Sequence, residues 1–146
     1  MEVIQARAEH LEKVSKLFDQ YRVFYNSSSD YEAAKQFIEA RFKHQDSAIF
    51  VACSGQTVIG FAQLYPSFSS VSMRRIWILN DLFVEEAYRG QGAGNALLKA
   101  AQAFAQETDA IRIALSTQVA NTPAQSLYEA SGYLKDCEFY HYSLSL

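Results

Sequence analysis

The segment Arg89-Gly90-Gln91-Gly92-Ala93-Gly94 follows an apolar run that ends at Val84 and precedes a helical pattern that reaches about Glu107. Glycines spaced this closely between a strand and a helix let backbone N–H groups approach an anion at the helix N-terminus. The GxGxG spacing lacks the Gly-Lys-Ser/Thr ending of nucleotide-triphosphate loops and differs from the GxGxxG of dinucleotide-binding proteins. The segment therefore predicts a phosphate-binding turn of another class, with a plain tight turn as the alternative.

Apolar periodicity on both sides of this segment predicts alternating strands and helices. Strands are expected over residues 2–8, 48–53, 57–65, 75–84 and 111–115, and helices over residues 10–25, 31–43, 96–107 and 122–131. Residues 66–70 are expected to form a loop, and residues 133–144 two short strands or one bent hairpin. The order βααβββαβαββ predicts an α/β fold with a mixed, mostly antiparallel sheet and helices on both faces.

The composition indicates one ordinary globular domain over residues 1–146, because 49% of the residues are apolar and 20% are charged. A net charge of -3 argues against nucleic acid as a partner. The N-terminus has no basic leader, and no stretch reaches the ~18 apolar residues of a membrane span, so a cytoplasmic location without membrane contact is expected. Two distant cysteines and three scattered histidines predict no metal site.

Two motifs carry a resemblance to a known family. Arg-x-x-Gly-x-Gly begins at Arg89, and Asn-x-x-Ala-x-x-Leu-Tyr-Glu-x-x-Gly-Tyr runs from Asn121 to Tyr133. Together they resemble the GCN5-related N-acetyltransferase (GNAT) superfamily. The resemblance spans the whole chain, is strongest over residues 78–134 and implies acetyl-CoA as co-substrate.

The resemblance also implies which residues bind acetyl-CoA. The backbone of residues 82–84 would pair with the pantetheine arm, residues 90–95 would hold the pyrophosphate, and Arg89 and Asn121 would flank the cofactor. The implied set is Leu82, Phe83, Val84, Arg89, Gly90, Gln91, Gly92, Ala93, Gly94, Asn95 and Asn121.

Two residues are candidates for proton transfer. The shared tyrosine of the family falls on Tyr128, which the resemblance implies as the acid that protonates the departing thiolate; the alternative is a core aromatic of a helix. An amine that is mostly protonated at neutral pH needs a proton acceptor, and Asp81 on an otherwise apolar strand is the best candidate, with a raised pKa expected from desolvation. Its alternative is a carboxylate paired within the fold. In polyamine-type relatives a glutamate precedes this aspartate, where the chain has Asn80.

The sequence thus predicts transfer of an acetyl group from acetyl-CoA to the primary amine of a small molecule. The absence of a recruitment domain or an extended charged tract favours a small acceptor over a protein acceptor. A catalytically idle acyl-CoA-binding module is the second hypothesis, and the aromatic segment 138–144 makes a homodimer a third, compatible one. The acceptor itself has no motif, because acceptor contacts come from variable loops.

Overall fold

The computed structural model describes residues 1–146, which form two compact units, Met1–Ser116 and Thr117–Leu146. The second unit contains one helix, α4 (Thr122–Ala130), followed by an extended segment. The elements of the first unit are, in chain order, β1 (Glu2–Gln5), the 3-10 helix η1 (Ala8–His10), α1 (Leu11–Phe24), α2 (Tyr31–His44), β2 (Ala48–Ser54), β3 (Thr57–Ser69), β4 (Arg74–Val84), the 3-10 helix η2 (Glu86–Tyr88), α3 (Ala93–Glu107) and β5 (Ile113–Ala114).

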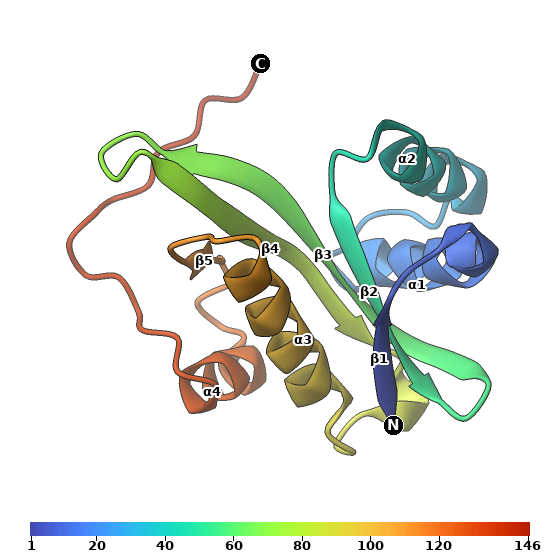
Figure 1. Cartoon of the computed structure of the whole chain (residues 1–146). Helices are drawn as coiled ribbons and strands as arrows, with labels where there is room; N and C mark the ends of the chain where they lie inside the picture. The colour runs from blue at the N-terminus through green and yellow to red at the C-terminus, as the bar shows by residue number, and fades with distance from the viewer. The chain divides into compact units, whose positions relative to one another are not determined.

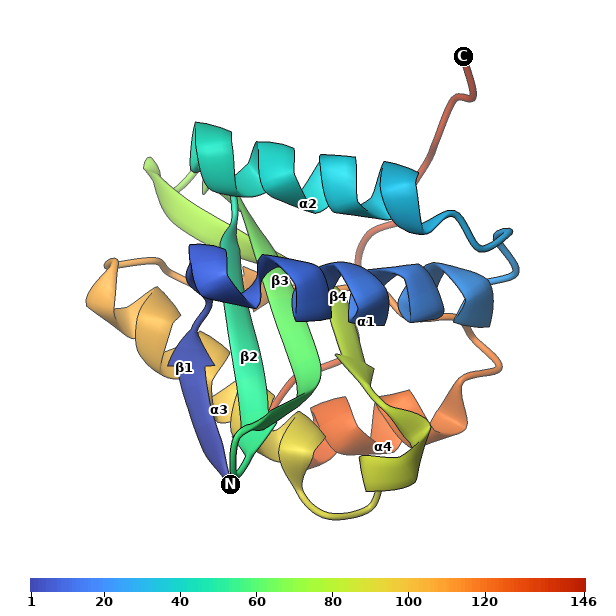
Figure 2. The ribbon, with the colours of Figure 1, turned by 90° about the vertical axis from the view of Figure 1, so that its right-hand side faces the viewer.

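The first unit is built on a five-stranded sheet in the order β1-β2-β3-β4-β5. The first three pairings are antiparallel and the β4–β5 pairing is parallel, which confirms the predicted mixed sheet. Helices α1 and α2 cover one face and α3 covers the other (Figures 1 and 2). None of the helices is long and apolar enough to span a membrane.

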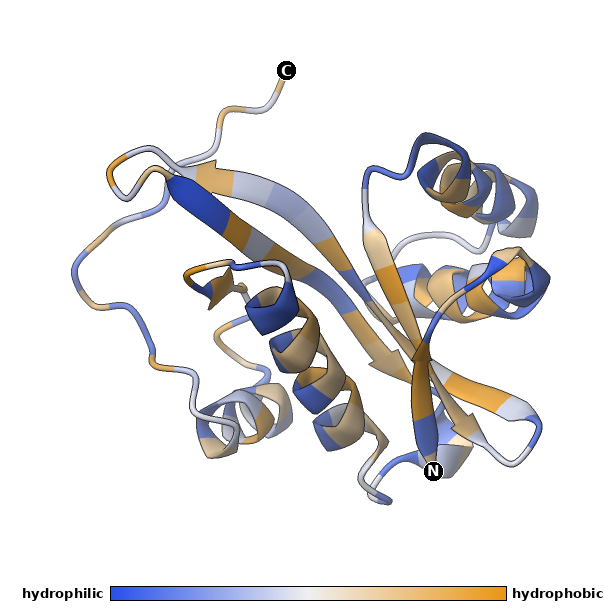
Figure 3. Ribbon diagram, in the orientation of Figure 1, coloured by the Kyte–Doolittle hydropathy of each residue, from blue (hydrophilic) through white to orange (hydrophobic).

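Two apolar layers hold the helices to the sheet. On the α1 and α2 face, Leu17 and Ile38 pack in a buried cluster with Phe61 and Phe83. On the other face, Phe104 of α3 lies with its ring centroid 5.3 Å from that of Phe50 and 4.9 Å from that of Trp77. Figure 3 shows hydrophobic residues along the central strands and mixed hydropathy along the helices that cover them. Aromatic side chains of this size bury a large apolar area and contribute much of the stability of such a core.

The start of α2 is as the sequence predicts. Asp30 is the N-cap, and its side chain accepts a hydrogen bond from the Ala33 N–H at 3.1 Å. The cap satisfies one of the N–H groups that the first helical turn leaves without a partner.

The loop predicted at residues 66–70 is wrong, because β3 continues to Ser69. Pro66 lies opposite Trp77 in the pairing with β4, whereas the pairing of β3 with β2 ends at Leu64. Beyond Leu64, β3 therefore has one open edge, where a residue without an N–H is tolerated. The two strands project as a long hairpin past the end of β2 (Figure 1).

The strands predicted over residues 133–144 are also wrong. This segment of the second unit forms no strand, and its large apolar side chains after Tyr133 are exposed, Tyr140 and Tyr142 to more than 90%. Alternating apolar residues favour an extended chain, but a strand also needs a neighbour for its backbone hydrogen bonds. The second unit contains no strand that could serve as this neighbour.

A β-bulge at Asn80 interrupts the β3–β4 pairing. Gln63 pairs with Asp81 and the next residue, Leu64, pairs with Leu79, so Asn80 has no partner in β3. One extra residue changes the face to which the following side chains point. Leu79 therefore lies on the α3 face with Trp77, while Asp81 lies on the α1 face with Phe83.

Gly60 allows close approach of β3 to β4. A Cβ atom at this position would lie 2.8 Å from the Phe83 carbonyl oxygen and 3.2 Å from Val84 Cγ2. We expect Gly60→Ala to lower the free energy of unfolding by about 1–3 kcal/mol, because the methyl group would push the two backbones apart. Urea denaturation measures the change, and an unchanged midpoint would contradict this account of the strand spacing.

Candidate active site

The N-terminus of α3 is open to an anion. Gly92 is its N-cap, with φ of 91°, and no side chain caps the first turn. Gly90 also has a positive φ, 76°, and a Cβ at either glycine would meet no atom within 4 Å. Because the first N–H groups of a helix lack intrahelical partners, the N–H groups of the residues that follow Gly92 are available to a bound phosphate. The geometry fits the phosphate-binding turn that the sequence predicts.

The edge of β4 that faces away from β3 is open over its C-terminal half. The parallel partner β5 pairs only with Trp77 and Ile78. The Glu85 N–H donates to the Ile59 carbonyl at 2.8 Å, so the peptide groups of Glu85 and, by alternation, of Phe83 face β3. Those of Leu82 and Val84 consequently face the open edge. An extended ligand could add to β4 there as a strand does.

The bulge brings Asp81 into a buried polar cluster. The Asp81 side chain is 3% exposed and Gln63 is fully buried. Gln63 Nε2 donates to Asp81 Oδ2 at 2.7 Å, and Asn80 Nδ2 donates to Asp81 Oδ1 at 3.2 Å. The Tyr21 hydroxyl of α1 also hydrogen-bonds Asp81 and donates to the Asn80 carbonyl at 3.1 Å. Asp81 is therefore hydrogen-bonded within the fold, which agrees with the alternative of a paired carboxylate. Amide N–H groups donate to both of its oxygens, and an ionised carboxylate can only accept hydrogen bonds.

Burial is the main influence on the proton affinity of Asp81. Desolvation raises the pKa of this carboxyl above its ordinary value, the direction that the sequence predicts, while the hydrogen bonds from Gln63, Asn80 and Tyr21 oppose the rise. A carboxylate with a raised pKa is a stronger base than one in water, which suits a group that accepts a proton near neutral pH.

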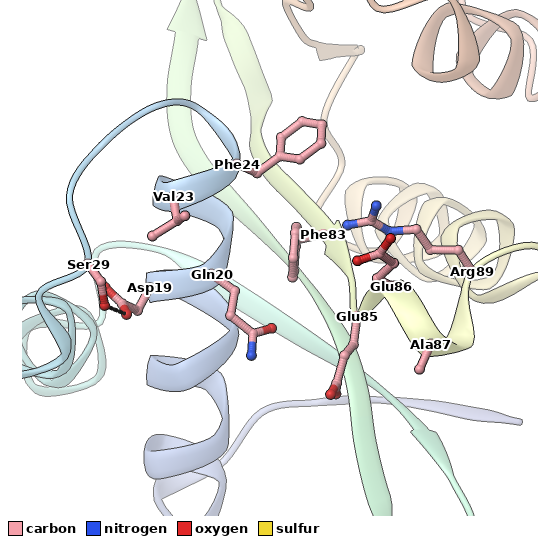
Figure 4. A pocket seen from close by; sticks show the side chains of 10 residues that line it. All are labelled: Asp19, Gln20, Val23, Phe24, Ser29, Phe83, Glu85, Glu86, Ala87 and Arg89. Atoms are coloured by element: carbon pink, nitrogen blue, oxygen red, sulfur yellow. Dashed lines mark hydrogen bonds between the residues drawn. The ribbon is translucent and has the colours of Figure 1, made fainter.

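An open cleft of about 1000 Å³ lies between α1 and the end of β4 (Figure 4). Its polar lining includes the carboxylates of Asp19, Glu85 and Glu86 and the guanidinium of Arg89. Its apolar lining comes from Val23, Phe24 and Phe83. Such a lining matches a ligand that combines a positive charge with an apolar part.

Arg89 is held where β4 leads into α3. Its Nε donates to the Val84 carbonyl at 2.8 Å, and its guanidinium carbon lies 5.2 Å from the Phe83 ring centroid and 5.7 Å from that of Phe24. The carbonyl of Val84 at the open edge is thus already used by Arg89. The guanidinium is fixed beside the cleft and next to the turn that holds Gly90.

The two candidates of the second unit lie on α4. Asn121 is the N-cap of this helix, and its Oδ1 accepts from the Ala124 N–H at 3.3 Å. Tyr128 is half-buried, and its ring centroid lies 5.9 Å from that of Tyr133. Burial raises the pKa of the Tyr133 hydroxyl. Asn121 therefore has a structural role in starting the helix that presents Tyr128.

Several polar residues of the Asp81 cluster and of the cleft were not expected from the sequence. Gln63 is a polar residue within an apolar strand, the same signal that singled out Asp81, but its pairing with Asp81 depends on the strand register. Ser47 and the cleft carboxylates Asp19 and Glu86 carry no comparable signal, because isolated serines and acidic residues are typical of surfaces. No group of three or more His, Cys, Asp or Glu side chains could hold a metal ion, and both cysteines are free.

Several known proteins with similar sequences or folds are acetyltransferases by name. The acetyltransferase (GNAT) family matches residues 11–133. The chain is 45% identical over 146 residues to the uncharacterized N-acetyltransferase YhfO of Bacillus subtilis (strain 168), covering 100% of this chain and 98% of that protein. A crystal structure of a probable acetyltransferase has a TM-score of 0.95 and 42% identity, covering 100% and 98% of the two chains. The aminoglycoside N-acetyltransferase AAC(6')-Iy in complex with CoA shares the fold, with a TM-score of 0.82, 22% identity and coverage of 99% and 95%.

Proposed function

Because this chain belongs to the acetyltransferase (GNAT) family and is an N-acetyltransferase, we propose that it transfers the acetyl group of acetyl-CoA to the primary amine of a small molecule. One observation carries the proposal: the buried carboxylate of Asp81 directly precedes the stretch of β4 whose outer edge is open. Asp81 would then act as a base beside the position that an extended thioester would take.

Acetyl-CoA would supply the activated acetyl group as a thioester. Residues 90–95, with Gly90, Gln91, Gly92, Ala93, Gly94 and Asn95, would bind its pyrophosphate through backbone N–H groups, and the open peptide groups of Leu82 together with the Val84 N–H would pair with its pantetheine arm. Arg89 would add a positive charge near the phosphates. Asn121 would act by starting the helix of Tyr128. The CoA complex of the aminoglycoside N-acetyltransferase, whose fold is shared, supports this cofactor.

The reaction needs two proton transfers. As the amine nitrogen bonds to the carbonyl carbon and the carbon–sulfur bond breaks, Asp81 would accept the proton of the amine, directly or through a water. Tyr128 would donate a proton to the departing sulfur, which otherwise leaves as a thiolate. In this scheme, Glu85 is the next candidate for the base.

The cleft between α1 and β4 is the proposed acceptor site. Three carboxylates and one guanidinium line it, and Glu85 lies 3.3 Å from Lys13 Nζ in an ion pair. The lining favours small amines with positive charge and an apolar part. A protein acceptor would need a docking surface beyond this cleft.

Substitution of Gly92 tests the phosphate site. We expect Gly92→Val to weaken acetyl-CoA binding tenfold or more, ~1.4 kcal/mol, because a β-branched residue is strained at φ of 91° and would distort the turn. Gly55→Val is the matched control, since Gly55 also has a positive φ, 62°, with open space around it, but lies in the β2–β3 turn. Calorimetric titration with acetyl-CoA should show a loss for Gly92→Val alone; equal affinities in both folded variants would refute the site.

An acceptor panel tests the function as a whole. The protein is mixed with acetyl-CoA, a thiol reagent and a range of small amines, polyamines and peptides, and CoA release is followed. Release with small cationic amines is expected. Binding of acetyl-CoA without release across the panel would instead indicate an idle acyl-CoA-binding module, and release with peptides alone a protein-directed enzyme.

A further inference from the structure

A chain of hydrogen bonds leads from the start of β2 to Asp81. Ser47 Oγ donates to Gln63 Oε1 at 2.9 Å, and Gln63 Nε2 donates to Asp81 Oδ2 at 2.7 Å. Gln63 also hydrogen-bonds the Tyr65 hydroxyl. Ser47 is half-buried, and Gln63 is fully buried on the α1 and α2 face of the sheet. The oxygen of the Gln63 amide is therefore engaged on one side, and its nitrogen on the other.

We propose that Ser47 and Gln63 are positioning residues that keep the Asp81 carboxylate in its ionised, proton-accepting form. Ser47 anchors the Gln63 side chain by donating to its amide oxygen, and Gln63 directs an N–H at the carboxylate. The proposal rests on the proposed role of Asp81 as the base of acetyl transfer.

The orientation of the amide decides which form of Asp81 is favoured. An amide nitrogen donates and stabilises an ionised carboxylate, whereas an amide oxygen accepts and stabilises a protonated one. In a buried site without competing water, both interactions are strong. The Ser47 hydroxyl donates to the Gln63 oxygen, although a hydroxyl can also accept from an amide nitrogen. A rotation of the amide by half a turn would break the hydrogen bond to Asp81 and place the amide oxygen against the carboxylate.

The other groups near Asp81 do not supply this control. The titratable groups that face it are the hydroxyls of Tyr21 from α1 and Tyr65 from β3. Burial, followed by the charge of Asp81, raises the pKa of Tyr65 to about 12, so this hydroxyl stays neutral at physiological pH. Arg41 and Asp46, whose Nε and Oδ1 lie 3.1 Å apart, also act on Tyr65. Asn80, the second amide donor, is exposed.

The test is the pKa of the Asp81 carboxyl, measured by carbon NMR on the intact protein with Asp81→Asn identifying its signal. We expect Ser47→Ala to raise this pKa by about 0.5–1 pH unit, the shift that corresponds to one lost hydrogen bond. Ser47→Thr keeps the hydroxyl and should restore the original pKa. Ser15→Ala is the matched control, because Ser15 is fully buried and donates to the Leu11 carbonyl at 2.7 Å in α1, away from the chain of hydrogen bonds.

Outcomes of the two proposals can be told apart. A merely structural role of Ser47 would lower stability in both alanine variants and leave the pKa of Asp81 unchanged, which would overturn the inference. Gln63→Leu should shift the pKa in the same direction as Ser47→Ala and to a greater extent. In the active enzyme, the acidic limb of the rate profile should move upward with the NMR value. A wild-type protein that releases no CoA with any acceptor would refute the proposed function. The NMR titration would still test whether the chain of hydrogen bonds controls the pKa of Asp81.

Discussion

Replacement of Tyr128 by phenylalanine is expected to lower turnover by about 100–10,000-fold, the usual contribution of a general acid. The variant keeps the ring and its contact with Tyr133, 5.9 Å between centroids, and the backbone bonds from the Ser131 and Tyr133 N–H groups to the Tyr128 carbonyl. Only the hydroxyl is lost. Acetyl-CoA affinity should therefore change little, and the defect should appear in the chemical step.

Tyr133→Phe is the matched control for this experiment. It removes a hydroxyl from the neighbouring ring of the same unit without removing the proposed acid. Single-turnover measurements separate chemistry from product release, which would otherwise hide the effect. If Tyr128→Phe and Tyr133→Phe react at the wild-type rate in a single turnover, water or another donor protonates the thiolate.

Asp81→Asn is expected to reduce turnover at neutral pH by about 100-fold or more, because the variant keeps the shape of the side chain and loses its basicity. Activity should recover in part as rising pH deprotonates the amine in solution. The measurement is a pH–rate profile of both proteins with one acceptor. A loss that is constant across pH would indicate a structural or acceptor-binding carboxylate, and full activity would direct attention to Glu85.

The free energy of unfolding of Asp81→Asn tests whether burial of the ionised carboxylate destabilises the folded wild-type protein. Because burial raises the pKa of Asp81 in the folded state, the folded protein holds this proton more tightly than the unfolded chain. The contribution of Asp81 to stability is then greatest below the ordinary aspartate pKa of about 4 and is lost as the pH rises through the folded-state value. Urea denaturation at several pH values should therefore show that the free energy of unfolding of the wild type falls relative to that of Asp81→Asn as the pH rises.

Most of the first unit could be predicted from the sequence. The apolar patterns predicted α1, α2 and the β2–β3 hairpin to within a few residues, because local periodicity decides which face each residue presents. The β3 extension past Pro66 could not be predicted in this way, since it depends on pairing with β4 alone, which sequence periodicity does not reveal. The C-terminal segment shows the opposite error: its pattern suits a strand, but strand formation depends on a partner that sequence periodicity does not reveal.

The site could be predicted in part. Gly92 and Asp81 were identified from residue type and local context. In the structure, Gly92 begins a helix without a side-chain cap, and Asp81 is a buried, hydrogen-bonded carboxylate. Gln63 and Ser47 could not be connected with Asp81, because the connection arises from cross-strand register and from a turn between α2 and β2. The roles of Tyr128 and the cofactor-binding residues, the single domain, the cytoplasmic location and the homodimer stay predictions.

The bulge at Asn80 makes this position tolerant of substitution. Asn80 is exposed and has no partner in the β3 ladder, so another residue can replace it without disturbing the strand pairing. A change from asparagine to glutamate would add a second carboxylate beside Asp81 while Trp77 and Phe83 keep their faces. Deletion of the residue would instead turn Asp81 toward the α3 core. Substitution at position 80 thus leaves the strand pairing and the face of Asp81 unchanged, whereas a change in the length of β4 alters both.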